Sequence, residues 1–214
     1  MLTHKELLKF AAAAYAENEV DFEKQLEIKG KTEAYYGDSL RKYITELDDC
    51  FVISFRGSVS KIDWIQNLTA IPIDVAHVNL SEGPYSELNS EINPRLSFTK
   101  PVYLTGHSLG GNLSLLEAFF LTEHNIEIAE SVTFGAPMSG SNSFKETVEE
   151  LLKDKVTNYI CGDDQVPNLP SFGYAKTGTQ INIGKKRSWF NPLKYYYIFK
   201  DHTILRYQEE MEKL

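Results

Sequence analysis

The sequence has only two cysteines among its 214 residues and no excess of basic residues. Cys50 and Cys161 each lie in an apolar run, so we expect two buried, reduced thiols rather than a disulfide or a reactive site. The formal net charge is −8, with 22 Lys and Arg against 30 Asp and Glu. Because a surface that binds nucleic acid has to be basic, this balance argues against nucleic acid as the main partner.

Long apolar segments are also missing. No run approaches the roughly 18 residues that a membrane-spanning helix needs. The stretch LLKFAAAAYA at the N-terminus has some features of a signal peptide, but Lys9 interrupts it. Thr3 and Glu6 form a capping-box pattern that predicts a helix over residues 3–18. We therefore expect cytoplasmic residence by default, or export by a route that needs no signal peptide.

Apolar, β-branched runs alternate along the chain with segments of helical periodicity. Four runs predict strands that are buried on both faces, at residues 50–55, 101–106, 130–137 and 156–162. Apolar stripes predict helices over 110–124 and 142–153. This alternation is typical of an α/β fold with a mostly parallel central sheet and helices on both faces.

The remaining segments predict peripheral structure. Residues 25–48 predict two outer strands joined at Gly37-Asp38, and residues 71–100, with three prolines, predict a loop and one short helix. Since no linker divides the chain, we expect one domain over residues 1–214.

Residues 106–110 read Gly-His-Ser-Leu-Gly, directly after a predicted strand and before a predicted helix. In this setting G-x-S-x-G is the nucleophile elbow of α/β-hydrolases. Glycines two residues either side of the serine let neighbouring segments approach closely, and the following helix directs N–H groups at the reacting centre. The pattern predicts Ser108 as a nucleophile, supported by Gly106, His107 and Gly110. The alternative is a glycine-rich turn with an incidental serine.

The order of residues along the chain then selects the partners of Ser108. In α/β-hydrolases an acid and then a histidine follow the serine. Of the five histidines only His202 leaves room for an acid-bearing strand before it. A histidine in this place accepts the serine proton and returns it to the leaving group. The alternative is a surface or packed histidine near the C-terminus.

Four aspartates are candidates for the acid. Asp154 lies in a charged helix end, and Asp201 would point away from His202 in an extended segment. Asp163 and Asp164 follow a predicted strand at its carboxyl end, where sites gather in α/β folds. Composition does not separate these two.

Several short segments, in this order, resemble the class 3 lipases (fungal triacylglycerol lipase-like α/β-hydrolases). They are FRGS at 55–58, DWIQNL at 63–68, TGHSLGG at 105–111, TFGAP at 133–137 and DDQVPNLP at 163–170, followed by His202 and Tyr207. The resemblance implies that Asp164 is the acid and His202 the base. It implies an oxyanion hole formed by Ser58 and Leu109, with Asn67 orienting the Ser58 hydroxyl, and it implies neither metal nor cofactor.

The resemblance also implies a lid between Ser58 and Leu68. Four side chains, Ile62, Trp64, Ile65 and Leu68, would form the apolar face of a short helix that covers the site in water and opens against lipid. The alternative is a connection that packs Trp64 into the core. Residues 78–93 lack the His-Gly-Phe-like turn of family members, which is a departure from the pattern.

The resemblance implies a lipid or acyl-ester substrate, cleaved as by a lipase or a phospholipase A. Residues 185–199 join basic residues to aromatic ones, which suits transient contact with a membrane surface or, alternatively, an edge strand and loop. Two other functions compete. An esterase or acyltransferase for soluble acyl esters would use the same residues, and a silent relative would bind lipid or protein without catalysis. The intact set of Ser108, Asp164 and His202 argues against the silent relative.

Overall fold

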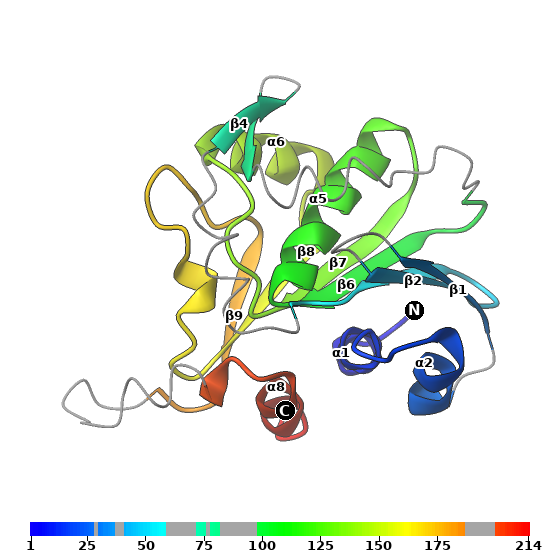
Figure 1. The fold of residues 1–214 in the computed structure, drawn as a ribbon. Coiled ribbons are helices and arrows are strands. Elements are labelled where there is room, and N and C mark those ends of the chain that lie inside the picture. Colours follow the sequence, from blue (N-terminus) through cyan, green and yellow to red (C-terminus); the bar gives the residue numbers. More distant parts are fainter. Residues whose placement is uncertain (28–29, 37–40, 59–71, 76–77, 82–97, 187–199) are drawn as a thin grey trace.

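The computed structural model describes residues 1–27, 30–36, 41–58, 72–75, 78–81, 98–186 and 200–214. A seven-stranded sheet with the order β1-β2-β3-β6-β7-β8-β9 forms its centre (Figure 1). Strands β3, β6, β7, β8 and β9 are parallel, whereas β1 and β2 add an antiparallel edge. The strands are β1 (Lys31–Tyr36), β2 (Arg41–Glu46), β3 (Phe51–Phe55), β6 (Val102–His107), β7 (Ile128–Phe134), β8 (Val156–Cys161) and β9 (Thr179–Ile183). The mostly parallel α/β sheet expected from the sequence is confirmed.

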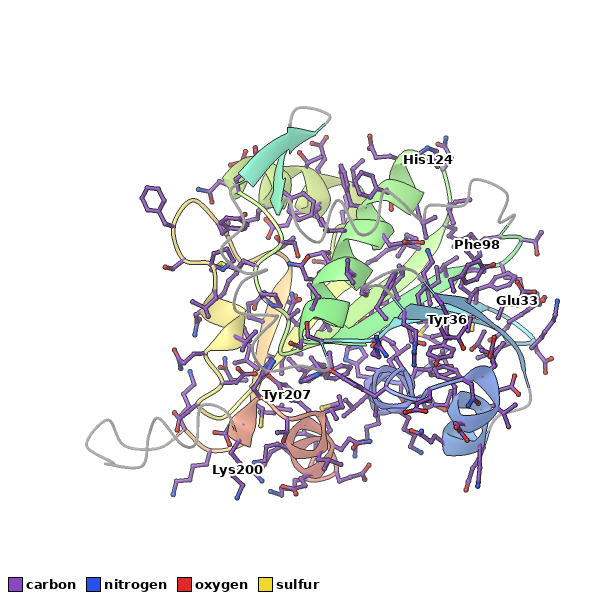
Figure 2. The ribbon with its side chains drawn as sticks, viewed as in Figure 1. Glu33, Tyr36, Phe98, His124, Lys200 and Tyr207 are labelled. Atoms are coloured by element: carbon purple, nitrogen blue, oxygen red, sulfur yellow. The ribbon has the colours of Figure 1, made fainter. Side chains whose placement is uncertain are left out.

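Helices cover both faces of this sheet. One face carries α1 (His4–Ala13), α2 (Glu19–Leu26) and α8 (Ile204–Met211), and the other carries α5 (Leu109–Glu123) and α6 (Asn142–Leu152) (Figure 1). Because successive strand residues point to opposite faces, Val52 packs with the first group and Ile53 with the second. Tyr207 of α8 is fully buried between its helix and the sheet (Figure 2).

Two expectations about the outer segments are corrected. The first helix begins at the predicted capping box but ends at Ala13. Asn18 starts a second helix because its side chain accepts the N–H of Asp21. In the segment expected to be irregular, β4 (Pro72–Val75) pairs with β5 (Val78–Ser81) in an antiparallel hairpin. The short helix expected there would have to lie in residues 82–97, which are outside the described part, as is the Gly37-Asp38 turn.

Both cysteines are buried and unpaired, as the sequence predicts. Burial raises the pKa of Cys50 to about 11 and that of Cys161 to about 12. Neither thiol is therefore a reactive thiolate near neutral pH. Among the described helices, none is both long enough and apolar enough to cross a bilayer.

Candidate active site

Ser108 stands at the turn between β6 and α5. Its backbone has φ 58° and ψ −129°, in the left-handed range that residues with a Cβ atom rarely adopt. The two flanking glycines make this turn fit. A Cβ atom on Gly106 would overlap the backbone of Gly110, and one on Gly110 would overlap the carbonyl oxygen of Phe55. The elbow therefore holds the Ser108 hydroxyl at the carboxyl edge of the sheet.

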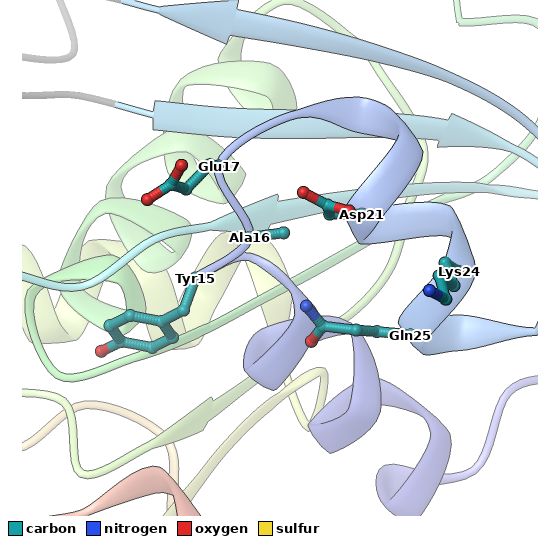
Figure 3. Close-up of a pocket in the computed structure, with 6 residues that line it drawn as sticks. All are labelled: Tyr15, Ala16, Glu17, Asp21, Lys24 and Gln25. Carbon is teal, nitrogen blue, oxygen red and sulfur yellow. The ribbon is translucent and has the colours of Figure 1, made fainter.

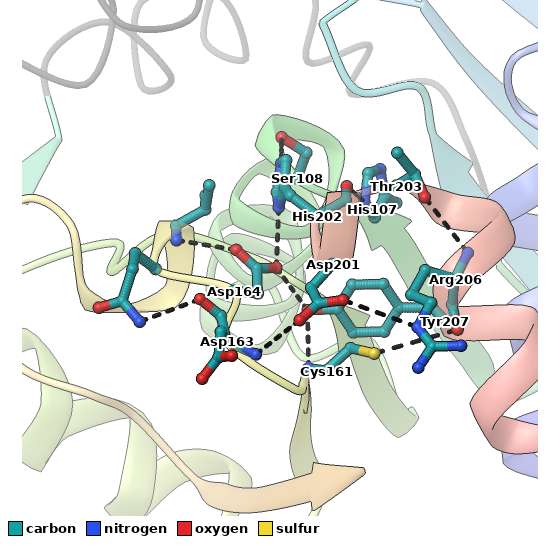
Figure 4. Close-up of polar contacts among 12 residues, drawn as sticks. His107, Ser108, Cys161, Asp163, Asp164, Asp201, His202, Thr203, Arg206 and Tyr207 are labelled. Carbon is teal, nitrogen blue, oxygen red and sulfur yellow. Dashed lines mark hydrogen bonds and ion pairs between the residues drawn. The ribbon is translucent and has the colours of Figure 1, made fainter. Parts of the chain in front are cut away.

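His202 lies between Ser108 and Asp164, although these residues are 94 and 38 positions away from it in the sequence (Figure 4). Its Nε2 is 2.9 Å from Ser108 Oγ, and its Nδ1 is 2.8 Å from Asp164 Oδ2. Because an ionised carboxylate only accepts hydrogen bonds, Nδ1 carries the proton and Nε2 is free to accept one from the hydroxyl. The structure thus brings together the three side chains selected from the sequence.

Asp164 receives hydrogen bonds from three donors. The Val166 N–H binds Oδ1 at 2.9 Å, whereas the Tyr207 hydroxyl, at 2.6 Å, joins His202 at Oδ2. The same hydroxyl accepts the N–H of Cys161 at 3.1 Å. Burial, together with the charge of Asp164, raises the pKa of Tyr207 well above its usual value. Tyr207 therefore stays a donor, and it fixes the carboxylate to the end of β8.

His107 connects the elbow to the segment that carries His202. Its Nε2 lies 2.9 Å from the His202 carbonyl oxygen, and its Nδ1 lies 2.7 Å from the Tyr15 hydroxyl. Since a carbonyl only accepts, Nε2 donates to it and Nδ1 accepts from Tyr15. Burial and the neighbouring His202 lower the pKa of His107 well below its usual value, so the ring stays neutral. Nothing in the motif pointed to Tyr15, which follows α1.

The hydroxyl of Tyr15 faces His107 and Gly57, whereas another part of Tyr15 borders the protein surface. A methyl group built on Gly57 would overlap the Tyr15 hydroxyl, so this hydroxyl lies against the turn that precedes Ser58. The other side of Tyr15 borders a surface pocket of about 470 Å³, which the segment joining α1 to α2 and one side of α2 line. The other residues that line this pocket are Ala16, Glu17, Asp21, Lys24 and Gln25, and the ring of Tyr15 extends away from them (Figure 3).

Of the two residues expected to form the oxyanion hole, Leu109 directly follows Ser108, and Ser58 follows Gly57, which lies close to Ser108. Leu109 is the first residue of α5, and the first N–H groups of any α-helix lack intrahelical acceptors. A Cβ atom on Gly57 would fall 3.3 Å from Ser108 Cβ, which places the residue before Ser58 against Ser108. Asn67 and the expected lid residues, Ile62, Trp64, Ile65 and Leu68, lie outside the described residues.

No metal centre emerges from the part of the chain that the structure describes. Within it, no three His, Cys, Asp or Glu side chains are grouped as metal ligands. The polar groups gathered around Ser108 suit proton transfer to and from a hydroxyl, and the N–H of Leu109 lies at the positive end of α5.

Comparison with known proteins identifies the family. The family model described as Lipase (class 3) matches residues 52–174, which is more than half of the chain. This chain belongs to the class 3 lipase family. The match contains the elbow and Asp164, and it ends before His202. The sequence-based family prediction is therefore confirmed.

Curated relatives and solved structures agree with this assignment. Secreted mono- and diacylglycerol lipase 3 of Gibberella zeae is 33% identical over 101 residues, covering 44% of this chain and 31% of the relative. Phospholipase A1-II 4 of Oryza sativa subsp. japonica is 24% identical over 174 residues, covering 64% and 44%. Lipase II of Rhizopus niveus superposes with a TM-score of 0.70 at 22% identity, covering 86% and 80%. The class 3 lipase chain thus spans less than half the length of the curated relatives named here, and it shares the α/β-hydrolase fold of the solved lipase.

The comparison also corrects the expectation of cytoplasmic residence. The Gibberella zeae relative is named a secreted lipase, which contradicts that expectation. The expectation rested on the lack of a signal-peptide pattern in the printed sequence, and such a lack does not determine where a class 3 lipase acts.

Proposed function

We propose that the protein hydrolyses carboxylic esters of lipids through an acyl-enzyme, with Ser108 as nucleophile, His202 as base and Asp164 as the acid that orients it. The observation that carries the proposal is the continuous hydrogen-bonded line from Ser108 Oγ through both nitrogens of His202 to Asp164. In this proposal residues 1–214 act as one α/β-hydrolase domain, and the protein acts outside the cell like its relative that is named secreted.

The reaction proceeds in two halves. In the first half Ser108 Oγ attacks the ester carbonyl carbon while His202 Nε2 takes the hydroxyl proton. The tetrahedral intermediate collapses, the bond to the alcohol breaks, and Nε2 gives its proton to the leaving oxygen. In the second half water attacks the acyl-enzyme and passes a proton to Nε2. The fatty acid then leaves, and Ser108 Oγ regains its proton from Nε2. Asp164 stabilises the imidazolium that forms in each half.

The negative charge of each tetrahedral intermediate needs donors close to Ser108. In the proposal the N–H of Leu109 and the N–H and hydroxyl of Ser58 supply them, and Asn67 orients that hydroxyl. The position of Leu109 at the start of α5 supports its part, because the helix dipole is positive there. A donor of this kind contributes about 3–4 kcal/mol to transition-state stabilisation.

A lipid substrate is supported by the names of the relatives, which include a mono- and diacylglycerol lipase and a phospholipase A1. Both names denote enzymes that cleave esters of glycerol-based lipids. We therefore propose a lipase or phospholipase A-type activity. Activity toward triacylglycerol, diacylglycerol and phosphatidylcholine vesicles, measured beside short-chain esters, tests this substrate class. Turnover of short-chain esters without turnover of any lipid would contradict it.

Contact with a lipid surface is part of the proposal. The short helix η1 (Val166–Asn168) follows Asp164, and the loop after it carries Phe172 with 94% of its surface exposed. Two backbone hydrogen bonds hold the base of this loop, from Met138 N to Leu169 O and from Ala175 N to Gly140 O, each 2.8 Å long. The loop thus exposes an apolar ring eight residues after Asp164 in the sequence. Most of the basic and aromatic segment 185–199 lies outside the described residues.

The contribution of Phe172 can be measured without catalysis. In the Ser108→Ala background, sedimentation with phospholipid vesicles should decrease when Phe172 is replaced by Ser. Val20→Ser is the matched control, because Val20 is 73% exposed on α2. Equal sedimentation of both variants would contradict a role for the loop.

A further inference from the structure

Two neighbouring residues, Asp201 and His202, bind two other neighbouring residues, Asp163 and Asp164. His202 binds the side chain of Asp164, and Asp201 binds the backbone of Asp163: its Oδ2 accepts that N–H at 2.9 Å (Figure 4). Asp201 does point away from His202, as the sequence suggested (Figure 4). The expected extended segment is wrong, because Lys200 and Asp201 are helical. Its carboxylate is therefore directed into the turn that carries Asp164.

The backbone around Gly162 is shaped to admit this carboxylate. Gly162 has φ +51°, and a Cβ atom on it would lie 2.5 Å from Asp201 Oδ2. Any side chain at this position would push the carboxylate out of its place. The end of β8 and Asp201 therefore fit each other closely at a point only two residues before Asp164.

The Asp201 carboxylate is also almost fully buried. Burial of a carboxylate is costly unless a cation lies nearby. Arg206 of α8 supplies the cation, with its Nε 3.7 Å from Asp201 Oδ1. Arg206 is itself held by Glu209 at 2.8 Å and by Glu210 at 2.5 Å. The hydrogen bond to Glu209 is the main reason why the pKa of Arg206 is raised, which keeps the guanidinium charged.

A buried ion pair such as that of Asp201 and Arg206 contributes little net stability, since apolar side chains can often replace such a pair without loss of stability. The ion pair does fix the position of the turn, because the Asp201 carboxylate accepts the N–H of Asp163, next to Asp164. A displacement of about 1 Å in a catalytic group is enough to cost about 100-fold in rate.

We propose that Asp201 is a positioning residue. It joins the turn that carries Asp164 to the turn that carries His202, and so it keeps the hydrogen bond between Asp164 and His202 in its observed geometry. This inference rests on the proposed function. Asp201 acts through Asp163 N–H and Arg206, and it takes no part in proton transfer.

The test uses the full chain and a soluble short-chain ester, so that binding to lipid plays no part. A serine-reactive phosphonate, allowed to react to completion, counts active sites, and kcat is expressed per titrated site. For Asp201→Ala we expect kcat to fall about 100-fold while KM changes less than about threefold. Asp201→Asn keeps an oxygen that accepts the Asp163 N–H, so its kcat should stay within about tenfold of the wild type. The control is Asp154→Ala, which removes an exposed carboxylate beyond α6 and should leave kcat unchanged.

Each outcome decides the matter. Unchanged kcat per site in Asp201→Ala would overturn the proposal even if the variant melts earlier, because a merely structural residue lowers stability and not turnover. Equal losses in the Asn and Ala variants would also overturn it. If Asp201→Ala does not fold, Gly162→Ala displaces the carboxylate instead, and full turnover by that variant would overturn the proposal. A wild-type protein inactive toward both ester and phosphonate would overturn the proposed function itself.

Discussion

A hydrogen bond joins the ring of His107 to the backbone of His202, and the ring of His202 takes no part in it. The Nε2–H of His107 donates to the backbone carbonyl oxygen of His202 at 2.9 Å, and the two ring centroids are 4.9 Å apart. The residue that precedes Ser108 therefore holds the backbone of His202 in place. This arrangement works only while the His107 ring is neutral, because its Nδ1 has to accept the hydroxyl of Tyr15.

The buried, neutral state of His107 predicts a dependence of stability on pH. Its pKa in the folded protein is lowered below the value of about 6.5 for an unfolded chain. Below about pH 6.5 the unfolded chain therefore binds a proton at His107 that the folded protein does not bind. The free energy of unfolding falls as the pH falls below about 6.5. The loss between pH 7.5 and pH 5, followed by urea denaturation, should be smaller in His107→Asn than in the wild type.

The control for this measurement is His124→Asn, because His124 is exposed at the end of α5 (Figure 2). This variant should lose as much stability between the two pH values as the wild type does. An equal loss in His107→Asn and the wild type would contradict the assignment of His107 as a buried neutral ring.

Tyr207→Phe removes a donor from Asp164 and an acceptor from the N–H of Cys161. Leaving buried polar groups unpaired costs about 1–3 kcal/mol of stability. The orientation of Asp164 should also loosen, so we expect kcat to fall about tenfold or more. Thermal denaturation and ester turnover measure the two effects. The control is Tyr36→Phe, at a half-exposed position on β1. If Tyr207→Phe had the same melting temperature and the same kcat as Tyr36→Phe, the role of Tyr207 in orienting Asp164 would be contradicted.

A buried ion pair lies on the face of the sheet that α5 and α6 cover. Lys42 of β2 donates to both carboxylate oxygens of Glu117 in α5, at 3.0 and 3.2 Å, and both side chains are almost fully buried. Lys42→Met leaves the Glu117 charge unpaired and should cost about 3–5 kcal/mol in the free energy of unfolding. The double variant Lys42→Met/Glu117→Leu should recover most of this loss. Additive losses in the double variant would show that the two charges are not coupled.

The two neighbouring aspartates should differ strongly in their effect on turnover. Asp164→Asn places an amide against His202 Nδ1 and favours the wrong tautomer, so kcat should fall by up to about 10⁴-fold. In Asp163→Asn the effect should be small, because its backbone N–H remains available to Asp201. Turnover of a soluble ester per titrated site measures both. The reverse order would reassign the acid.

Patterns that depend on local chemistry and burial could be predicted from the sequence. The apolar runs at 50–55 and 101–106 became β3 and β6 because a central parallel strand is covered on both faces and therefore reads as continuously apolar. The motif at 106–110 predicted the turn at Ser108, since its geometry depends on adjacent residues. The order of the partners along the chain then led to His202, and the family resemblance selected Asp164 over Asp163.

Elements and contacts that depend on distant residues could not be predicted in this way. Strand β9 is short and partly exposed at the sheet edge, so its residues show no apolar run. The capping box predicted where the first helix begins but not its end at Ala13. Tyr15, beyond that end, is directed to His107, which is 92 positions away. Asp201 was set aside as the acid, yet its contact with Asp163 requires a fold that brings two turns together. The expected lid remains a prediction.

The most direct test of the central claim is the reaction of the intact protein with a fluorophosphonate, followed by mass spectrometry of its peptides. The account predicts one adduct, on Ser108, which is absent in Ser108→Ala and forms at least about 1000-fold more slowly in His202→Asn. An adduct on another residue, or equal rates of labelling in His202→Asn and the wild type, would contradict it.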